Sequence, residues 1–328
     1  MHFSWKRWRV VLTAALTALA MSLAIAGQAV AAEPGESGSW TEEQVGSQTL
    51  AARGTLAEAR NGGYLLQAWR GETNNIVWLS INNGNAFQLT NPDGSSTGTD
   101  FSPAVVGYGQ NSFMVFHTGT DGNIYYTQVS PASGTWTGYW TAVPAQSTNM
   151  AVSVAQLGGG SNQLYMVYHS SSNDRVYGTQ YDGSGWQGAQ WIAGGSSPSA
   201  PSVTYQSFTG LTVVARGVGS NQIWMSSSGN PYNQWSSWTD IGGNAYNSPT
   251  IAANNQTGTI LVSYVDPGSL RPNYRAFGVY GNPVSDWSQD ITGWQTLNPV
   301  ALSVLGAAIY VILTGLNDNV YYKQVFSS

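Results

Sequence analysis

The segments Asn123–Tyr126 (NIYY) and Asn319–Tyr322 (NVYY) are two copies of the short pattern that decides the fold. In each copy a turn residue leads into a β-branched residue and then into aromatic side chains. Six copies occur in the chain: Asn75–Trp78, Asn123–Tyr126, Arg175–Gly178, Gln222–Met225, Asn273–Ala276 and Asn319–Tyr322. Their second residues lie about 49 residues apart, and a fixed period of this length is typical of repeat architectures.

Each repeat contains four short segments with the composition of β-strands. A run of small and β-branched residues comes first, as in Pro249–Ala252, and an apolar run such as Leu164–Tyr168 comes second. The NIYY pattern is third, and a segment with Trp, such as Trp235–Trp238, is fourth. Gly, Asn, Ser and Pro separate these runs, and no sustained helical period occurs among them. Four strands in about 49 residues predict one blade of a β-propeller.

The two ends of the repeat region complete one another. The last repeat stops at Phe326–Ser328, after its third strand, and an unassigned Trp segment, Trp40–Val45, precedes the first full repeat. An open ring would leave unpaired strand edges. The sequence therefore predicts an all-β, six-bladed β-propeller of four-stranded blades whose last blade is closed by the N-terminal strand. The predicted blades are residues 50–97, 98–146, 147–197, 198–245, 246–297 and 298–328 with 39–48.

The first 32 residues have the organisation of a signal peptide. Basic residues near the start are followed by the uncharged apolar stretch Val10–Ala26, and Ala29 and Ala31 fit a cleavage site. Because the apolar stretch approaches the minimum spanning length, an uncleaved membrane anchor is the alternative. The polar residues that follow favour cleavage. We expect a single domain, residues 33–328, that is secreted to the extracellular space and does not contact the membrane after cleavage.

The composition excludes several function classes. Charged residues make up 8% of the chain, against about 25% in ordinary proteins, while 42% hydrophobic and 12% aromatic residues suffice for a core. The net charge of −5 offers no basic surface for a nucleic acid. The absence of Cys excludes disulfides and Cys-ligated metals, and after the signal peptide only two His occur. We expect no metal and no cofactor.

Side chains able to bind a ligand recur at the end of the second strand. Alignment of the repeats places Arg70, His117, His169 and Arg216 at one position in four of the six repeats. Arg offers a planar set of donors and His a donor and an acceptor, which suits the hydroxyls of a sugar. The alternative is structural, since these side chains could instead bind hairpin carbonyls or stack on a Trp.

Aromatic side chains supply the second part of the candidate site. We include Trp69, which precedes Arg70, and the third-strand residues Trp78, Tyr126, Tyr177 and Trp224. The apolar face of a sugar stacks well on an indole or phenol ring. The alternative is packing, because large aromatic residues commonly fill the space between propeller blades.

These repeats, with an Ile-Tyr-Tyr or Ile-Trp strand and a Trp-rich fourth segment, resemble the β-propeller lectins of the fucose-specific type. The resemblance covers the chain from about Trp40 to the C-terminus. It implies a secreted, non-catalytic protein that binds neutral glycans or glycoconjugates in pockets between blades, each built from an Arg, a Glu and an aromatic residue. Arg70 and Arg216 match the Arg, whereas Glu58 and Glu72 recur in no other repeat, which leaves the sugar open.

Two other function classes stay open. Sialidases are also six-bladed propellers, but only Tyr181–Trp186 approaches their Ser-x-Asp-x-Gly-x-Thr-Trp box. The sequence shows no paired carboxylates with the features of a glycosidase. A sialidase-like or other glycoside-acting enzyme is therefore one alternative. A scaffold that binds a protein or a cell-wall polymer is the other, since the surface is rich in uncharged polar residues.

Overall fold

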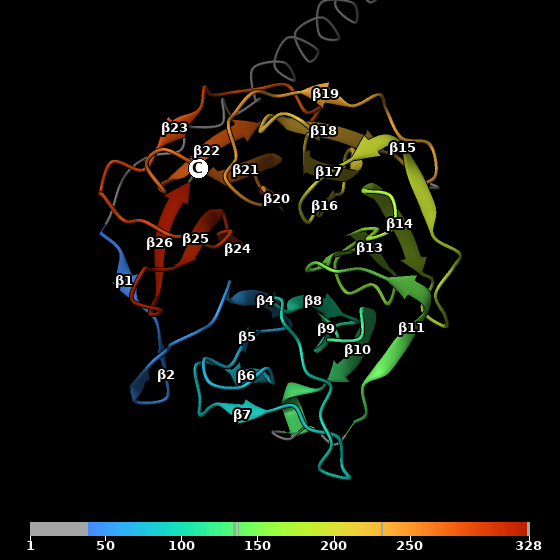
Figure 1. Ribbon diagram of the computed structural model, residues 1–328, viewed down its shortest axis with the longest axis vertical. Coiled ribbons are helices and arrows are strands. Elements are labelled where there is room, and N and C mark those ends of the chain that lie inside the picture. The colour runs from blue at the N-terminus through green and yellow to red at the C-terminus, as the bar shows by residue number, and fades with distance from the viewer. Residues whose placement is uncertain (1–38, 134–135, 137, 231, 327–328) are drawn as a thin grey trace, which may run out of the picture. The chain divides into compact units, whose positions relative to one another are not determined.

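The computed structural model describes residues 39–133, 136, 138–230 and 232–326, and strands dominate this part of the chain (Figure 1). One 3₁₀ turn, Pro131–Ser133, accompanies them. Within the described residues no helix has the length and apolar character needed to cross a membrane. The predicted signal peptide, residues 1–32, lies outside the described residues.

Six four-stranded antiparallel sheets surround a central axis, which confirms the predicted propeller (Figure 1). Blade 1 contains β4 (Ala57–Asn61), β5 (Tyr64–Arg70), β6 (Val77–Ile81) and β7 (Phe87–Gln88). Blade 2 contains β8 (Ala104–Tyr108), β9 (Ser112–Thr118), β10 (Asn123–Val129) and β11 (Thr141–Ser147). Blade 3 contains β12 (Ser153–Gln156), β13 (Leu164–His169), β14 (Arg175–Tyr181) and β15 (Gln190–Ser196). Blade 4 contains β16 (Ser202–Gln206), β17 (Gly210–Arg216), β18 (Ile223–Ser228) and β19 (Thr239–Asp240).

Blade 5 contains β20 (Thr250–Asn254), β21 (Thr259–Val265), β22 (Pro272–Phe277) and β23 (Ser288–Gln289). Blade 6 contains β24 (Ala301–Leu305), β25 (Ala308–Thr314), β26 (Val320–Phe326) and, at its outer edge, β1 (Thr41–Glu42). The innermost strands β4, β8, β12, β16, β20 and β24 contact one another in this order, and β24 contacts β4 again. The ring is closed.

The N-terminal segment closes the last blade, as predicted from the incomplete last repeat. Thr41 lies opposite Tyr322, and the Asn319 side-chain amide donates to Glu42 Oε1 at 2.8 Å. A short hairpin of β2 (Gln44–Val45) and β3 (Gln48–Thr49) follows. We call residues 39–51 the clasp, because it pairs with blade 6 and then passes over to blade 1.

The core lies between the blades. Buried side chains of the second and third strands form clusters that each join two neighbouring blades, and Val115, Val213 and Val262 are fully buried in three of them. Each interblade linker also donates one backbone hydrogen bond to the turn between the second and third strands of the blade it leaves. The six bonds run from Ala52 N to Asp318 O, Thr99 N to Asn75 O, Thr148 N to Gly122 O, Ser197 N to Asp174 O, Ala245 N to Asn221 O and Thr296 N to Leu270 O, over 2.7 to 3.0 Å.

One buried ion pair fastens blade 6 to blade 5. Lys323 Nζ on β26 lies 3.4 Å from Asp290 Oδ2, and both side chains are almost completely buried. Asp290 also accepts the backbone N–H of Thr292 at 2.8 Å, and the Thr292 hydroxyl accepts the indole N–H of Trp40 at 2.8 Å. The clasp is therefore tied to blade 5 as well as to blade 6.

Deletion of residues 33–49 tests the role of the clasp. Without β1 the outer edge of β26 is unpaired, so we expect a lower melting temperature and concentration-dependent oligomers in size-exclusion chromatography. Deletion of residues 33–38 alone keeps the clasp and serves as the control. A protein that lacks residues 33–49 but stays monomeric with an unchanged melting temperature would contradict this role.

Candidate functional site

Strand register divides the predicted column of Arg70, His117, His169 and Arg216. Arg70, His169 and Arg216 lie opposite Val77, Val176 and Ile223, whereas the residue opposite Ile124 is Thr118. The turn of blade 2 is one residue shorter than the others in this set. Since successive strand residues face opposite sides of the sheet, His117 faces away from the column. The predicted equivalence of His117 with the other three was therefore wrong.

In four of the blades the side chain at the column position binds the linker to the next blade. Arg216 Nη1 donates to the carbonyl of Tyr246 at 2.8 Å, and Arg70 Nη1 donates to the carbonyl of Asp100. The hydroxyls of the equivalent residues Thr118 and Thr314 bind the linker carbonyls of Met150 at 2.6 Å and Gly54 at 2.5 Å. Burial lowers the pKa of both Arg side chains. These contacts give the column a structural role, and its role in ligand binding stays a prediction.

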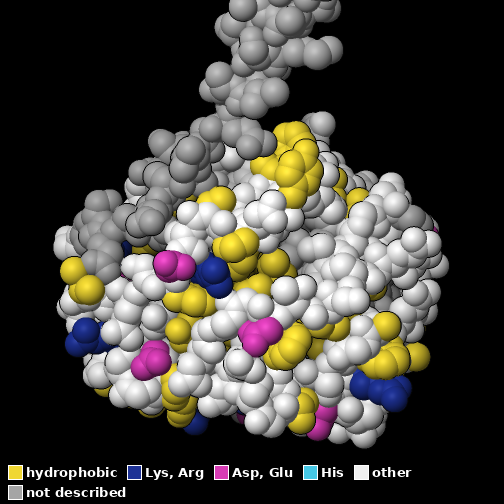
Figure 2. Space-filling view, turned by 90° about the horizontal axis from the view of Figure 1, so that it is seen from above, with side chains coloured by type: hydrophobic (Ala, Val, Ile, Leu, Met, Phe, Trp, Pro, Cys, Tyr) yellow, Lys and Arg dark blue, Asp and Glu magenta, His cyan; other side chains and the backbone are white. Residues whose placement is uncertain are grey.

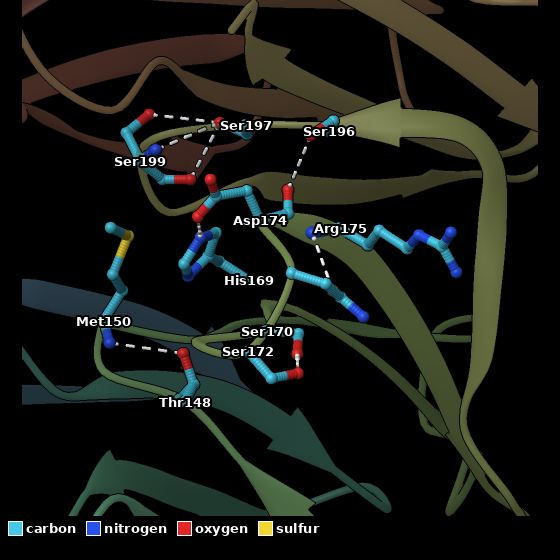
Figure 3. Close-up of polar contacts among 11 residues, drawn as sticks. Thr148, Met150, His169, Ser170, Ser172, Asp174, Arg175, Ser196, Ser197 and Ser199 are labelled. Atoms are coloured by element: carbon cyan, nitrogen blue, oxygen red, sulfur yellow. Dashed lines mark hydrogen bonds and ion pairs between the residues drawn. The ribbon is translucent and has the colours of Figure 1, made fainter.

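His169 binds a carboxylate of its own blade (Figure 3). Its Nε2 lies 3.0 Å from Asp174 Oδ1, and its side chain is 2% exposed. The nearby hydroxyls bind backbone carbonyls instead of the imidazole: Ser196 Oγ donates to Asp174 O at 3.0 Å, and Ser197 Oγ donates to Ser199 O at 2.9 Å. The residues in Figure 3 therefore lack the hydroxyl–imidazole contact of a serine hydrolase.

His117 is enclosed by aromatic rings. Its ring centroid lies 5.4 Å from that of Tyr125 and 4.4 Å from that of Trp140, and Nε2 lies 2.7 Å from Thr97 Oγ1. Burial lowers the pKa of His117 to about 4. The imidazole is consequently neutral at pH 7 and acts as part of the packing.

The third-strand aromatic column is also shifted in blade 2. The relevant position directly follows the Val or Ile that pairs with the end of the second strand. It holds Trp78, Tyr177 and Trp224, and in blade 2 it holds Tyr125. The prediction that Tyr126 occupies it was wrong. Tyr126 faces the other side of the sheet, and its ring centroid lies 5.9 Å from that of Trp186.

A second column of Trp residues seals the outer spaces between blades. It occupies the position directly before the outer strand, in Trp40, Trp140, Trp238 and Trp287. Their indole N–H groups donate to Thr292 Oγ1 and to the carbonyls of Leu89, Ala193 and Ile241 over 2.8 to 3.3 Å. Each acceptor belongs to the preceding blade. In blades 1 and 3 the same position holds Ala86 and Ala189.

A cavity of about 490 Å³ lies where blade 1 has Ala86 in place of this Trp. One wall is the clasp hairpin, residues 45–51, and the other is blade 1. We call this cavity the clasp pocket. Trp69, only 4% exposed, and the half-buried Trp78 form its aromatic part. Exposed polar residues surround them: Ser47, Gln48, Thr49, Glu72, Thr73 and Asn85.

The clasp pocket combines a ring surface with uncharged hydrogen-bonding groups. Trp78 is oriented by its indole N–H, which donates to Asn74 Oδ1 at 3.3 Å. Glu72 is the one charged residue among those that line the pocket. A shallower cavity of about 350 Å³ occupies the equivalent place between blades 5 and 6, where the rings of Trp294 and Tyr321 contact each other at an interplanar angle of 44° with centroids 4.1 Å apart. The described residues contain no group of His, Cys, Asp or Glu that could hold a metal ion.

Sequence reasoning found Trp69 and Trp78 but missed the rest of this pocket. Arg70, His117, His169, Arg216, Tyr126, Tyr177 and Trp224 are not among its lining residues. The sequence does carry a signal for it, since the first full repeat lacks the Trp segment of the later repeats. The contribution of Gln48 and Thr49 has no such signal, because it depends on how the clasp passes over blade 1.

Replacement of Arg216 by Met tests the structural role of the column. The carbonyl of Tyr246 loses its charged donor, so we expect the free energy of unfolding to fall by about 1–2 kcal/mol in denaturant titration. Arg53→Met, at an exposed side chain, is the control. An Arg216→Met protein with unchanged stability and lost ligand binding would assign Arg216 to the ligand instead.

The buried His117 predicts a pH dependence of stability. Its pKa is about 4 in the folded protein and 6.5 in the unfolded chain, so between these values the unfolded chain binds more protons. Stability should therefore fall as the pH drops from 6.5 to 4, by about 3 kcal/mol from this group. The free energy of unfolding of the wild type and of His117→Gln, measured by denaturant titration across this pH range, isolates the contribution of His117. The carboxylates are the same in both proteins, so their effect cancels in the difference. Parallel pH profiles would contradict it.

Comparison with solved structures finds the same fold in carbohydrate-active proteins. The Aleuria aurantia lectin, solved with Fucα1-6GlcNAc, matches with a TM-score of 0.62 and 13% identity over 84% of this chain and 93% of the lectin. SapL1 lectin, solved with α-methyl fucoside, matches with a TM-score of 0.56 and 13% identity over 85% of this chain and 98% of the lectin. The α-L-arabinofuranosidase of Fusarium graminearum matches with a TM-score of 0.59 and 14% identity over 89% of this chain and 98% of the enzyme.

No family model matches the chain, and no curated protein matches it. At identities of 13–14% the structural likeness bears on the fold alone. It confirms the resemblance found in the sequence: the chain has the six-bladed propeller fold of the fucose-specific lectins.

Proposed function

We propose that this protein is a secreted lectin that binds neutral glycans in the clasp pocket without catalysis. The observation that carries the proposal is the gap at Ala86, where two Trp side chains face polar groups on the clasp and on blade 1. The lectins among the structural neighbours support carbohydrate binding. The signal-peptide pattern of residues 1–32 supports secretion.

The lining chemistry favours a neutral sugar. An indole face attracts the C–H groups of a sugar ring, while Gln48, Thr49 and Asn85 offer donors and acceptors to its hydroxyls. Glu72 accepts hydrogen bonds and repels an anionic sugar. The pocket volume suits a small oligosaccharide. Charged side chains are few and scattered over the face of the molecule seen in Figure 2, in keeping with the charged fraction of 8%.

Glycoside hydrolysis is the second candidate, because an arabinofuranosidase shares the fold. The side-chain amide of Gln67 donates to Glu43 Oε1 at 2.8 Å and to Glu58 Oε2 at 3.4 Å, which brings two carboxyl groups together. Burial raises the pKa of Glu43, as a general acid requires. Neither residue lines the clasp pocket, so hydrolysis would use a different part of the molecule.

Ala86→Trp tests the lectin proposal, because it restores the side chain that four other blades carry. The indole should fill the clasp pocket, strongly reduce binding to an array of neutral glycans and leave the melting temperature unchanged or higher. Ala189→Trp, the same substitution at the equivalent position of blade 3, should keep binding. Glu72→Gln should reduce affinity by removing one charged acceptor.

Glycan binding that is undiminished in folded Ala86→Trp protein would place the site elsewhere. A parallel assay with nitrophenyl glycosides distinguishes glycoside hydrolysis, the second candidate function, from binding alone. Turnover that is lost in Glu58→Gln would favour hydrolysis, and binding without turnover favours the lectin.

A further inference from the structure

Blade 3 lacks a second packing side chain, at a different place from the clasp pocket. One third-strand residue lies two positions after the residue that pairs with the end of the second strand, which is Pro272 in blade 5 and Val or Ile elsewhere. This third-strand residue is large in the other blades: Leu79, Tyr126, Met225, Tyr274 and Tyr322. In blade 3 it is Gly178. A cavity of about 230 Å³ lies there, between β14 and β15 on one side and residues 232–233 of blade 4 on the other. We call it the edge cavity.

Tyrosine rings form the apolar part of the edge cavity. Tyr165, 4% exposed, lies over Gly178, and a Cβ atom at Gly178 would come within 2.2 Å of its hydroxyl, so this ring position requires Gly. The ring of Tyr232 meets that of Tyr165 edge to face, with centroids 6.5 Å apart. Burial raises the pKa of Tyr165 to about 12, so this phenol stays neutral.

Three amide side chains, Gln180, Gln190 and Asn233, line the same cavity, and none has a hydrogen bond to another described residue. Their donors and acceptors are therefore available to a ligand. A fourth amide is held in place, since Gln187 Nε2 donates to Asp182 Oδ2 at 2.6 Å. The Thr179 hydroxyl fixes the same loop by donating to Gln187 O at 2.7 Å.

Among the described residues, none with a charged side chain lines the edge cavity. Free amides beside tyrosine rings match a ligand with several hydroxyls, an apolar face and no charge. The volume lies below that of pockets for larger ligands, so it suits one sugar residue. We propose that the edge cavity is a second carbohydrate site, which binds a single neutral sugar residue at the end of a glycan.

This site is independent of the clasp pocket. The two lie in different blades and share no lining residue, and Tyr165 stands near the start of the second strand whereas Trp69 stands near its end. Two unlike sites on one chain would let a single molecule bind two glycan chains. Binding to a dense glycan surface would then gain from multivalency.

Gly188→Phe is the direct test, because a Cβ atom at Gly188 meets no atom within 4 Å. The ring should occupy the edge cavity without disturbing the fold. Gly185→Phe, in the same loop but outside the cavity, has equally open surroundings and is the matched control. A double variant, Gln180→Ala with Asn233→Ala, removes two free amides without adding bulk. It tests the same site if the Gly188→Phe protein does not fold.

The probes are an array of neutral mono- and oligosaccharides and calorimetric titration with the best array ligand. In an Ala86→Trp background, which closes the clasp pocket, we expect residual array binding that Gly188→Phe or the double Ala variant abolishes and Gly185→Phe keeps. Residual binding that survives both cavity variants, or no residual binding in this background, would overturn the second site. Unchanged binding in Ala86→Trp that Gly188→Phe removes would support the edge cavity and refute the clasp pocket.

Discussion

The ring depends on one backbone hydrogen bond that is repeated at every interface. Each linker N–H binds the turn of the blade it leaves, from Ala52 to Asp318 at the closure and from Thr99 to Asn75 at the next interface. This bond fixes where a new blade starts relative to the last one. Arg216 and Thr118 bind carbonyls of the same linkers, so a column of side chains that resembles a binding motif in the sequence supports this geometry.

Both candidate sites arise where a repeated packing residue is missing. Ala86 replaces the Trp that closes four other interfaces, and Gly178 replaces a large side chain that five other blades carry. A close-packed repeat protein gains little from an unfilled position, because a cavity costs contacts on every side. Two such positions, each beside aromatic rings and free polar groups, are therefore better explained by ligands than by loose packing.

The sequence predicted the fold because the repeat carries it. The period of about 49 residues and the incomplete last repeat led directly to six blades and to closure by Thr41 and Glu42. The equivalence of His117 and Tyr126 with their neighbours failed for a simple reason. The turn of blade 2 is one residue shorter, and in a strand a shift of one residue moves a side chain to the opposite face. The pocket wall formed by the clasp could not be predicted, since it depends on contacts between distant residues.

A crystal structure with the neutral sugar that the array selects tests the central claim most directly. If the missing Trp at Ala86 created the site, the sugar ring should lie against Trp69 and Trp78, with hydroxyls near Glu72 and Asn85. A sugar bound beside Arg216 or between the innermost strands of the ring, with the clasp pocket empty, would contradict the assignment of the site to the clasp pocket.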